Sequence, residues 1–412
     1  MILRPELLWD GARFVRNREV EVADGSIVAV RASTDTHEAG RALLPGFVNA
    51  HSHAFQRGLR GRGETFPAGQ GSFWTWREAM YELVESLDLE SAHALCLQAF
   101  REMVRAGMTT VGEFHYLHHL PGSEGYELDE VVIDAARTAG LRMVLLHAYY
   151  NTGGFDQPLE GGQRQFRSAT PDAYWKQIDA LDGKVELGCV LHSVRAATRA
   201  HLRDVRAEAK RRGLVTHIHL EEQRREIEEC RAHYGVSPMQ LVLDEMAVDD
   251  TLVAVHCTHS TSDEMAAYRG AGGRVNNCPL TEANLGDGLP DGWFPVSLGS
   301  DSNARISMLE EMRWLEYGQR LRNEERGALR AEDGSVAPGL LRCGTVEGSE
   351  ALGIPAGRIE AGCHADFVSI DLDHPSLAGW TDETLAAALV FGCPDDVIAE
   401  VSIEGRPVYS RS

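Results

Sequence analysis

Short runs of consecutive hydrophobic residues recur along the middle of the chain, and helical or loop segments separate them. The runs cover residues 43–49, 109–114, 141–148, 185–191, 214–220, 252–257, 274–278 and 296–299. Because their hydrophobic positions are consecutive and not alternating, we interpret them as parallel strands buried on both faces. Most connecting segments, such as residues 92–106 and 198–212, have the periodicity of amphipathic helices. Eight strand–helix units in succession predict an α/β protein with a closed (β/α)8 barrel of TIM type.

Short alternating segments mark both ends of the chain. Near the N-terminus, Asp24-Gly25 separates two such segments and predicts a hairpin, since glycine supplies the positive φ of a tight turn. A similar pattern returns near the C-terminus, with a turn at Glu404-Gly405. We expect the two ends to pair into a small β-sandwich domain of residues 1–45 and 350–412, and residues 46–349 to form the barrel.

Composition narrows the functional classes. The 62 acidic and 40 basic residues give a net charge of −22, which argues against nucleic-acid binding and against anionic membranes. The eight cysteines occur singly and without a disulfide or metal-binding spacing, so we expect reduced thiols in the cytoplasm. The chain shows neither a signal-peptide pattern near Met1 nor a hydrophobic stretch of about 18 residues.

The strongest chemical signal is a histidine pair at the end of the first hydrophobic run. His51 and His53 are two residues apart, so in an extended strand both can reach one ion. His219 lies at the end of the fifth run and Asp301 follows the eighth, and barrel enzymes place their active sites at the C-terminal ends of strands. These residues would form a zinc shell that leaves one position for water. Asp301, within Ser-Asp-Ser, could instead be a helix N-cap.

Further polar residues near these strand ends suit proton transfer. Glu222 lies three residues beyond His219, and Glu221 competes with it for the role of proton shuttle. We assign His256 a second acid–base or electrostatic role, supported by His259, and interpret His217 as a core histidine. The predicted reaction is metal-assisted deprotonation of water, attack on an sp2 carbon and protonation of a nitrogen leaving group.

The end of the fourth run indicates a single metal ion. Barrel hydrolases with two metals commonly bridge them with a modified lysine at this position, where this chain has residues 189–193 without lysine. Lys184 precedes the run and would lie at its opposite end. Imidazole and carboxylate ligands also accept Fe²⁺ or Mn²⁺, so the sequence leaves the identity of the metal open.

With these residues in place, the chain resembles the amidohydrolase superfamily over its full length. Within it, the chain is most similar to the formimidoylglutamate deiminase family of histidine degradation. The segments that carry this resemblance are residues 51–57, 72–77, 113–119, 217–223, 256–259 and 281–288.

The resemblance implies an enzyme that hydrolyses N-formimino-L-glutamate to N-formyl-L-glutamate and ammonia, and that forms a homodimer. One zinc ion would be bound by His51, His53 and His219, with Asp301 close to the ion and activating the water. Glu222 and His256 would transfer protons. The residues that would hold the substrate are Gln56, Arg77, Tyr116, His192 and Arg195. Guanidinium groups bind carboxylates bidentately, which agrees with a glutamate portion.

One departure from the family pattern leaves the substrate open. The family has a histidine two residues after Asp301, where this chain has Asn303. A shifted substrate preference could follow, with Arg305 as a third cation in the site. The first alternative is therefore a related deaminase of a purine, pterin or guanidino compound. The second is a binding protein that has lost catalysis, although the chain retains each metal ligand and proton shuttle.

Overall fold

The computed structural model describes residues 1–411 except residues 63, 67–68, 70 and 72. Ser72, the first residue of one of the motifs above, lies outside the described residues, as does Ser412.

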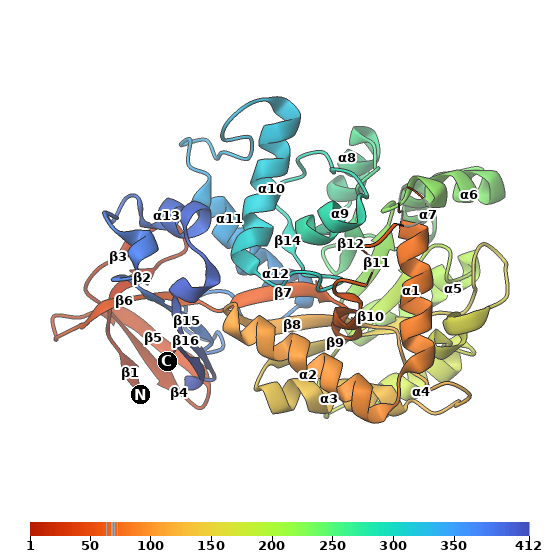
Figure 1. The fold of residues 1–412 in the computed structure, drawn as a ribbon, viewed down its shortest axis with the longest axis horizontal. Helices are drawn as coiled ribbons and strands as arrows, with labels where there is room; N and C mark the ends of the chain where they lie inside the picture. Colours follow the sequence, from red (N-terminus) through yellow and green to blue (C-terminus); the bar gives the residue numbers. More distant parts are fainter. Residues whose placement is uncertain (63, 67–68, 70, 72, 412) are drawn as a thin grey trace.

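Eight parallel strands form a nearly closed barrel in which neighbouring strands follow in chain order (Figure 1). They are β7 (Phe47–Ser52), β8 (Met108–His115), β9 (Arg142–Tyr149), β10 (Glu186–Ser193), β11 (Thr216–Leu220), β12 (Leu252–His256), β13 (Arg274–Asn277) and β14 (Ser297–Leu298). A single bridge between Ser52 and Asp301 joins the first strand to the chain that follows the last. The predicted barrel fold is confirmed.

Helices follow the strands and cover the outside of the barrel. They are α2 (Leu89–Arg105), α3 (Glu127–Ala139), α4 (Pro171–Leu181), α5 (Arg199–Arg212), α6 (Arg224–Tyr234), α7 (Pro238–Glu245), α8 (Ser262–Gly270), α9 (Pro279–Leu285), α10 (Met308–Asn323), α11 (Ala337–Cys343) and α12 (Val346–Leu352). Local sequence fixes several starts: Thr198 caps α5, and Thr261 with Glu264 forms a capping box on α8. The additional helix α1 (Phe73–Ser86) supplies one wall of the pocket described below.

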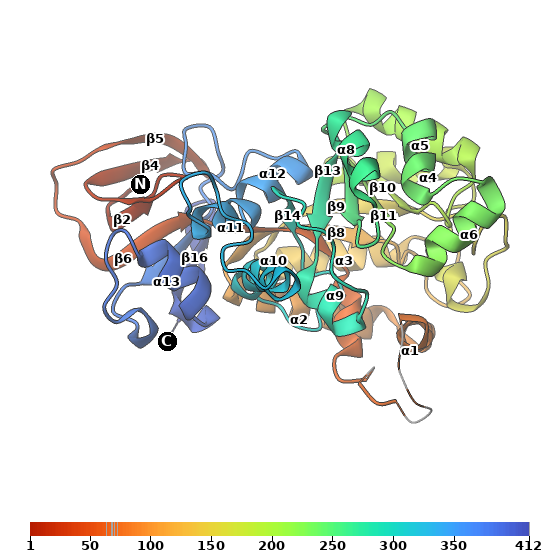
Figure 2. The same ribbon diagram turned by 90° about the horizontal axis from the view of Figure 1, so that it is seen from above.

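The two ends of the chain build sheets beside the barrel, where red N-terminal and blue C-terminal strands lie side by side in Figures 1 and 2. A six-stranded sheet has the order β17-β16-β15-β6-β2-β3, and a three-stranded sheet has the order β1-β4-β5. These strands are β1 (Ile2–Leu3), β2 (Pro5–Trp9), β3 (Phe14–Val15), β4 (Arg18–Ala23), β5 (Ser26–Ala32), β6 (Glu38–Pro45), β15 (Phe367–Asp371), β16 (Ile398–Ile403) and β17 (Arg406–Ser410), with α13 (Leu385–Gly392) beside them. Leu8, Val20, Ile27 and Phe367 share a buried hydrophobic cluster.

The first hydrophobic run does not form one strand, which corrects the sequence interpretation. Leu43 to Pro45 belong to β6 in the six-stranded sheet, and the barrel strand begins only at Phe47. Gly46 lies between them, and a Cβ atom there would be 2.0 Å from Oγ1 of Thr109. The close approach of the β8 side chain therefore requires glycine where the chain passes from one sheet to the other.

The predicted N-terminal hairpin is present. Asp24 and Gly25 have φ values of 48° and 75°, the two positive values of a type I′ turn, and they connect β4 with β5.

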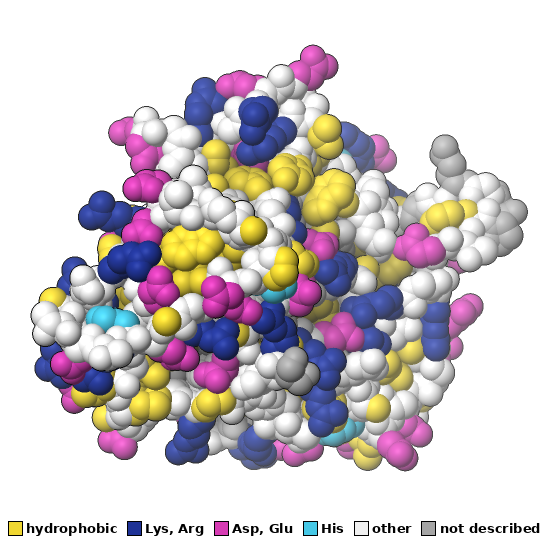
Figure 3. All heavy atoms as spheres, turned by 60° about the vertical axis from the view of Figure 1, so that its left-hand side comes forward, with side chains coloured by type: hydrophobic (Ala, Val, Ile, Leu, Met, Phe, Trp, Pro, Cys, Tyr) yellow, Lys and Arg dark blue, Asp and Glu magenta, His cyan; other side chains and the backbone are white. Residues whose placement is uncertain are grey.

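Acidic, basic and hydrophobic side chains share the face of the molecule that Figure 3 shows. In the described part of the chain, no helix has both the length and the apolar character needed to span a bilayer.

Candidate metal centre and active site

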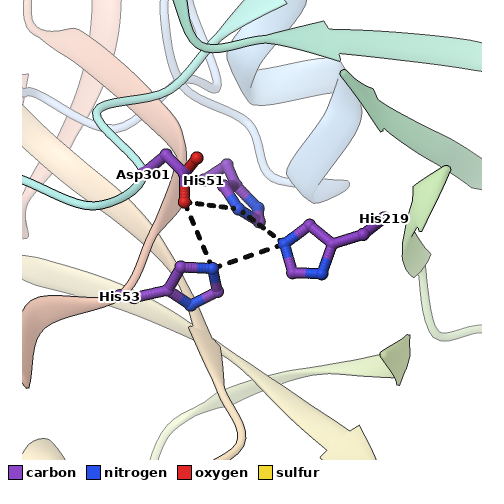
Figure 4. Close-up of side chains that lie close together, drawn as sticks. All are labelled: His51, His53, His219 and Asp301. Carbon is purple, nitrogen blue, oxygen red and sulfur yellow. Dashed lines mark hydrogen bonds and ion pairs between the residues drawn. The ribbon is translucent and has the colours of Figure 1, made fainter. Parts of the chain in front are cut away.

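Four buried side chains converge at the C-terminal end of the barrel (Figure 4). His51 and His53 come from the end of β7, His219 from β11 and Asp301 from the turn after β14. Nε2 of His219 lies 3.2 Å from Nε2 of His51 and 3.3 Å from Nε2 of His53. Oδ1 of Asp301 lies 3.4 Å and 3.2 Å from the same two nitrogens. The four residues, which we call the metal cluster, thus face a common point.

Hydrogen bonds behind two of the rings determine which nitrogens carry protons. Nδ1 of His53 lies 2.8 Å from the carbonyl oxygen of Phe114, and Nδ1 of His219 lies 3.0 Å from that of His192. Because a carbonyl can only accept, we assign the hydrogen of each ring to Nδ1, which leaves a lone pair on each Nε2. These lone pairs face each other at 3.3 Å. They repel unless a cation lies between them, and a carbonyl partner on Nδ1 is typical of histidine ligands.

The ionisation of the metal cluster also suits a cation. Burial lowers the pKa of His51 to about 4 and that of His53 to about 3, so both rings are neutral near pH 7. Burial disfavours ionised Asp301, but its hydrogen bond to His51 and the nearby imidazoles hold the pKa of this carboxyl below its usual range. Neutral imidazole and ionised carboxylate are the forms that bind Zn²⁺. The residues therefore fit a divalent metal ion.

A pocket opens above the metal cluster, and the structure brings the predicted site residues together around it. Ten of them line the pocket, namely His53, Gln56, Arg77, Tyr116, His192, Arg195, His219, Glu222, His256 and Asp301. His51 is fully buried and contacts the pocket residues His219 and Asp301. Residues from six barrel strands or their following turns and from α1 thus meet in one site.

Glu222 and His256 form an acid–base pair beside Asp301. His256 Nε2 lies 3.9 Å from a carboxylate oxygen of Glu222 and 3.7 Å from Oδ2 of Asp301, while Nδ1 faces Glu282 at 3.4 Å. Burial raises the pKa of Glu222 to about 7. Burial opposes protonation of His256, but the carboxylates of Glu222, Glu282 and Asp301 raise the pKa of this ring to about 10. Near neutral pH the site therefore combines an imidazolium with a carboxyl group poised to exchange a proton.

Several positive φ angles mark the same end of the barrel. Glu221, His256, Cys257, Asp301 and Asn303 have φ values between 46° and 74°, although none of them is glycine. Such backbone strain clusters at functional sites, where the surrounding structure holds it in place.

Glu221 does not compete with Glu222 for the pocket. Its carboxylate accepts hydrogen bonds from the Ser260 hydroxyl at 2.5 Å and from the Met239 amide at 3.0 Å. These bonds connect the end of β11 to the start of α7 and to the turn after β12, so Glu221 has a structural position. His217 lies in the core, where its Nε2 donates to the Ala351 carbonyl at 2.9 Å.

Arg77 and Arg195 present guanidinium groups to the pocket. Arg77 forms no ion pair with the described residues and stacks on Trp74, with 4.4 Å between its guanidinium carbon and the ring centre. The Nε of Arg195 donates to Glu226 at 3.1 Å, and Glu226 also accepts the Glu221 amide at 2.8 Å. The terminal nitrogens of Arg195 form no hydrogen bond within the described structure, so both arginines can bind a ligand.

The turn after Asp301 differs from the sequence expectation. Arg305 does not line the pocket but forms ion pairs with Glu310 at 2.7 Å and Asp395 at 3.4 Å, so its prediction as a third cation of the site is wrong. The side chain that reaches the pocket from this turn is Ser302. Asp301 is not a helix N-cap either, because Ser307 caps the following helix, α10.

The sequence analysis missed several residues of the pocket wall. They are Phe73, Trp76, Met80, Tyr81, Tyr150, Phe166, Leu285 and Ser302. Tyr150 follows the third barrel strand, so the rule that located the other residues at strand ends could have identified it. The residues of α1 had no such signal, because only the tertiary structure brings this helix over the barrel.

A family model described as the amidohydrolase family matches residues 42–408. The chain belongs to the amidohydrolase family. It is therefore an enzyme, a metal-dependent hydrolase that acts on C–N bonds.

Individual relatives agree with this assignment. Formimidoylglutamate deiminase of Pseudomonas aeruginosa is 37% identical over 95% of this chain and 91% of its own length. A 5-methylthioadenosine/S-adenosylhomocysteine deaminase of Halobacterium salinarum is 29% identical over 86% of this chain and 79% of its own. The crystal structure of an amidohydrolase from Brucella melitensis has a TM-score of 0.88 at 31% identity and covers 100% of this chain and 96% of that chain. The resemblance inferred from the sequence motifs is confirmed.

Proposed function

We propose that this enzyme hydrolyses N-formimino-L-glutamate to N-formyl-L-glutamate and ammonia. The decisive observation is that Arg77 and Arg195 line the same pocket as the metal cluster. An N-formimino-glutamate has one carboxylate on the carbon that carries the amidine nitrogen and a second carboxylate at the end of its side chain. Two guanidinium groups match the carboxylates, and the metal cluster with its acid–base pair matches the amidine. The relative from Pseudomonas aeruginosa supports this substrate.

Gln56 and Tyr116 add a polar contact for the same ligand. The Gln56 side-chain nitrogen lies 2.6 Å from the Tyr116 hydroxyl, and its Oε1 is buried without a partner. An unsatisfied buried acceptor is costly, and an N–H group of the substrate would satisfy it. We therefore assign Gln56 to the binding of a substrate nitrogen.

The reaction adds water to the amidine carbon and releases the terminal nitrogen as ammonia. The metal cluster would hold a divalent ion, which would supply a water nucleophile at neutral pH. Glu222, whose pKa is close to 7, would take up one proton as water adds to the amidine carbon and pass it to the terminal nitrogen, and would then carry the remaining hydroxyl proton of the adduct to the same nitrogen. Both hydrogens of water thus leave with ammonia, and its oxygen becomes the formyl carbonyl. The positive charge of His256 stabilises negative charge that develops beside it in the transition state.

We further propose zinc as the metal, one ion per chain, because the donor set of three imidazoles and one carboxylate suits Zn²⁺. Metal analysis of the purified enzyme tests this assignment. A cytoplasmic location agrees with the eight cysteines, all of which are free thiols. The homodimer stays a prediction, which light scattering of the purified enzyme tests.

The substrate is tested by ammonia release from formiminoglutamate, formiminoaspartate and guanidino acids. We expect formiminoglutamate to be preferred. Arg77→Ala and Arg195→Ala should raise KM for it by about 10- to 100-fold, the equivalent of one lost charge-assisted hydrogen-bonded pair of about 1.5–3 kcal/mol. Arg305→Ala is the matched control, since it removes a nearby arginine that pairs outside the pocket. Unchanged KM values in both pocket variants would contradict the dicarboxylate substrate.

The proton shuttle is tested with the two neighbouring glutamates. Glu222→Gln should lower kcat by about 10²- to 10⁴-fold, the usual contribution of a general acid–base. Glu221→Gln should retain most of kcat, because Glu221 connects β11 to α7 and does not line the pocket. Equal losses of kcat in the two variants would contradict the assignment of Glu222.

A second candidate function is deamination of a purine nucleoside. The 29% identity to the Halobacterium salinarum deaminase favours it, as do the aromatic side chains of the pocket, which could stack on a heterocycle. Those side chains are Phe73, Trp76, Tyr81, Tyr150 and Phe166. Faster ammonia release from adenosine derivatives than from formiminoglutamate would select this function.

A further inference from the structure

The barrel closes at a weak seam between β7 and β14. Every other neighbouring pair of barrel strands shares at least two paired positions, whereas only the bridge between Ser52 and Asp301 crosses this seam in the described structure. Two backbone hydrogen bonds accompany the bridge, from the His53 amide to the Asp301 carbonyl at 2.9 Å and from the Asp301 amide to the His51 carbonyl at 3.0 Å. Three of the four residues of the metal cluster therefore lie at the least paired junction of the barrel.

The side chain of Asn303 crosses this seam. Asn303 is fully buried, and its Nδ2 lies 3.0 Å from the carbonyl oxygens of both His53 and Asp301. The same nitrogen lies 3.1 Å from the hydroxyl of Ser52, and Oδ1 accepts a hydrogen bond from the Ser300 hydroxyl at 2.7 Å. One amide thus connects the backbone of a ligand on β7 to the backbone of the ligand after β14.

A second amide supports the first from inside the barrel. Asn49 donates from Nδ2 to the Ser300 hydroxyl at 2.7 Å, and its Oδ1 accepts the Ser300 amide at 3.0 Å. The Ser300 hydroxyl therefore links Asn49 to Asn303. We call Asn49, Ser52, Ser300 and Asn303 the seam clasp.

We propose that Asn303, through the seam clasp, is a positioning residue that sets the spacing of the metal ligands on β7 and after β14. Its acceptors are the backbone carbonyls of His53 and Asp301. Asn303 therefore holds the backbone from which these two side chains extend. Their functional atoms lie 3.2 Å apart, and a shift of the seam would change that distance directly. The inference rests on the metal site of the proposed function and is independent of the substrate.

The residue type agrees with this role. The φ of Asn303 is 58°, a region that asparagine tolerates better than most residues with a side chain. Its side-chain amide also supplies two hydrogens and one acceptor within a short side chain. The hydrogen bonds to the two carbonyls and to the Ser300 hydroxyl use all three. Asn303, where the family has a histidine, does not line the pocket. This difference from the family pattern therefore affects the residues behind the metal ligands.

Asn303→Gly tests the proposal, since glycine keeps the positive φ without strain and removes only the side chain. We expect the variant, loaded with zinc, to release the ion to a chelator about 10- to 100-fold faster, which is the size of the loss in metal affinity when an outer partner of a metal ligand is removed. The Co²⁺-substituted variant should also show shifted visible absorption bands. Asn17→Gly is the matched control, because Asn17 has the same φ of 58° in an exposed turn.

Ser300→Ala is a second variant. It keeps the contacts of Asn303 with the two carbonyls and should accelerate metal release by a smaller factor than Asn303→Gly.

Native release rates and cobalt bands in Asn303→Gly would overturn the proposal. A lower melting temperature of the metal-free protein with native metal release would also overturn it, because the clasp would then be structural only. Failure to turn over formiminoglutamate, with altered metal release in Asn303→Gly, would overturn the substrate and support the clasp.

Discussion

Two clusters in this chain have the same composition, three histidines and one aspartate, but differ in what holds them together. The metal cluster lines the pocket. The other, which we call the outer cluster, contains Asp129 on α3 with His115, His118 and His147 near the ends of β8 and β9. All four of its residues are buried, and none lines the pocket.

The outer cluster is held together by hydrogen bonds to a central carboxylate. Asp129 lies at its centre and accepts hydrogen bonds from His115 at 3.0 Å, His118 at 2.9 Å, and His147 and Gln177 at 2.8 Å each. The second nitrogen of His118 donates to the Ala148 carbonyl at 2.9 Å, so both of its nitrogens face acceptors. The two nitrogens of His118 are therefore placed as donors, one to Asp129 and one to the Ala148 carbonyl.

In the metal cluster, by contrast, two Nε2 lone pairs face each other and no hydrogen lies between them. The metal cluster therefore needs a cation between its rings, whereas hydrogen bonds to a central carboxylate hold the outer cluster together. The number of histidines and aspartates in a cluster therefore does not identify a metal site. The positions of the hydrogens on the imidazole rings do.

Removal of one imidazole from each cluster should give the largest contrast. His219→Ala should lose the metal and reduce activity by more than the roughly 100-fold that loss of an outer partner costs. His118→Ala should keep one metal per chain and most of the activity. Metal analysis and ammonia release measure both effects. If the wild type holds two metals and His118→Ala holds one, the outer cluster is a metal site and the comparison fails.

Asp129→Asn should mainly affect stability. It removes the buried carboxylate that accepts hydrogen bonds from His115, His118 and His147, and breaking such a buried ionic network costs about 3–5 kcal/mol. Urea unfolding of the zinc-loaded enzyme measures the loss, and the metal content should stay at the wild-type value. An exposed pair provides the control: Asp134→Asn removes the partner of His93 and should change the free energy of unfolding by less than about 1 kcal/mol. A loss of similar size in both variants would contradict the role of the buried carboxylate.

Acidification should produce a smaller, graded effect. Burial lowers the pKa of His147 in the outer cluster to about 4, and that of His217 in the core to about 4. Between pH 6.5 and pH 4 the unfolded chain binds protons that these two rings do not bind in the folded state. The free energy of unfolding should therefore fall with pH by about 1.4 kcal/mol per pH unit for each ring.

Urea unfolding of the metal-free protein from pH 7 to pH 4.5 measures this slope. His217→Phe removes one such ring outside both clusters, and its slope should be smaller by about 1.4 kcal/mol per pH unit. An unchanged slope in this variant would mean that His217 takes up its proton in the folded state as well.

Sequence patterns predicted the barrel because parallel strands buried on both faces must be hydrophobic at consecutive positions. The prediction of one strand over residues 43–49 was wrong. Leu43 to Pro45 belong to the six-stranded sheet, and Gly46 separates them from the barrel strand. Residues 113–119, one of the segments that carry the family resemblance, contribute only Tyr116 to the pocket, while His115 and His118 form hydrogen bonds with Asp129.

By itself, the sequence determined the order of the barrel strands, the family and the identity of the residues that meet at the metal cluster. The strand order and the metal cluster follow from local hydrophobic pattern and from the rule that functional side chains gather at the C-terminal ends of barrel strands. The family follows from the resemblance of the sequence motifs. Only the tertiary structure decided that Glu222 and not Glu221 faces the pocket, that Arg305 pairs elsewhere and that Asn303 joins the two sides of the seam. Each of these depends on a partner far away in the chain, and a hydrogen bond or ion pair between distant segments exists only once folding has placed both groups within about 3 Å.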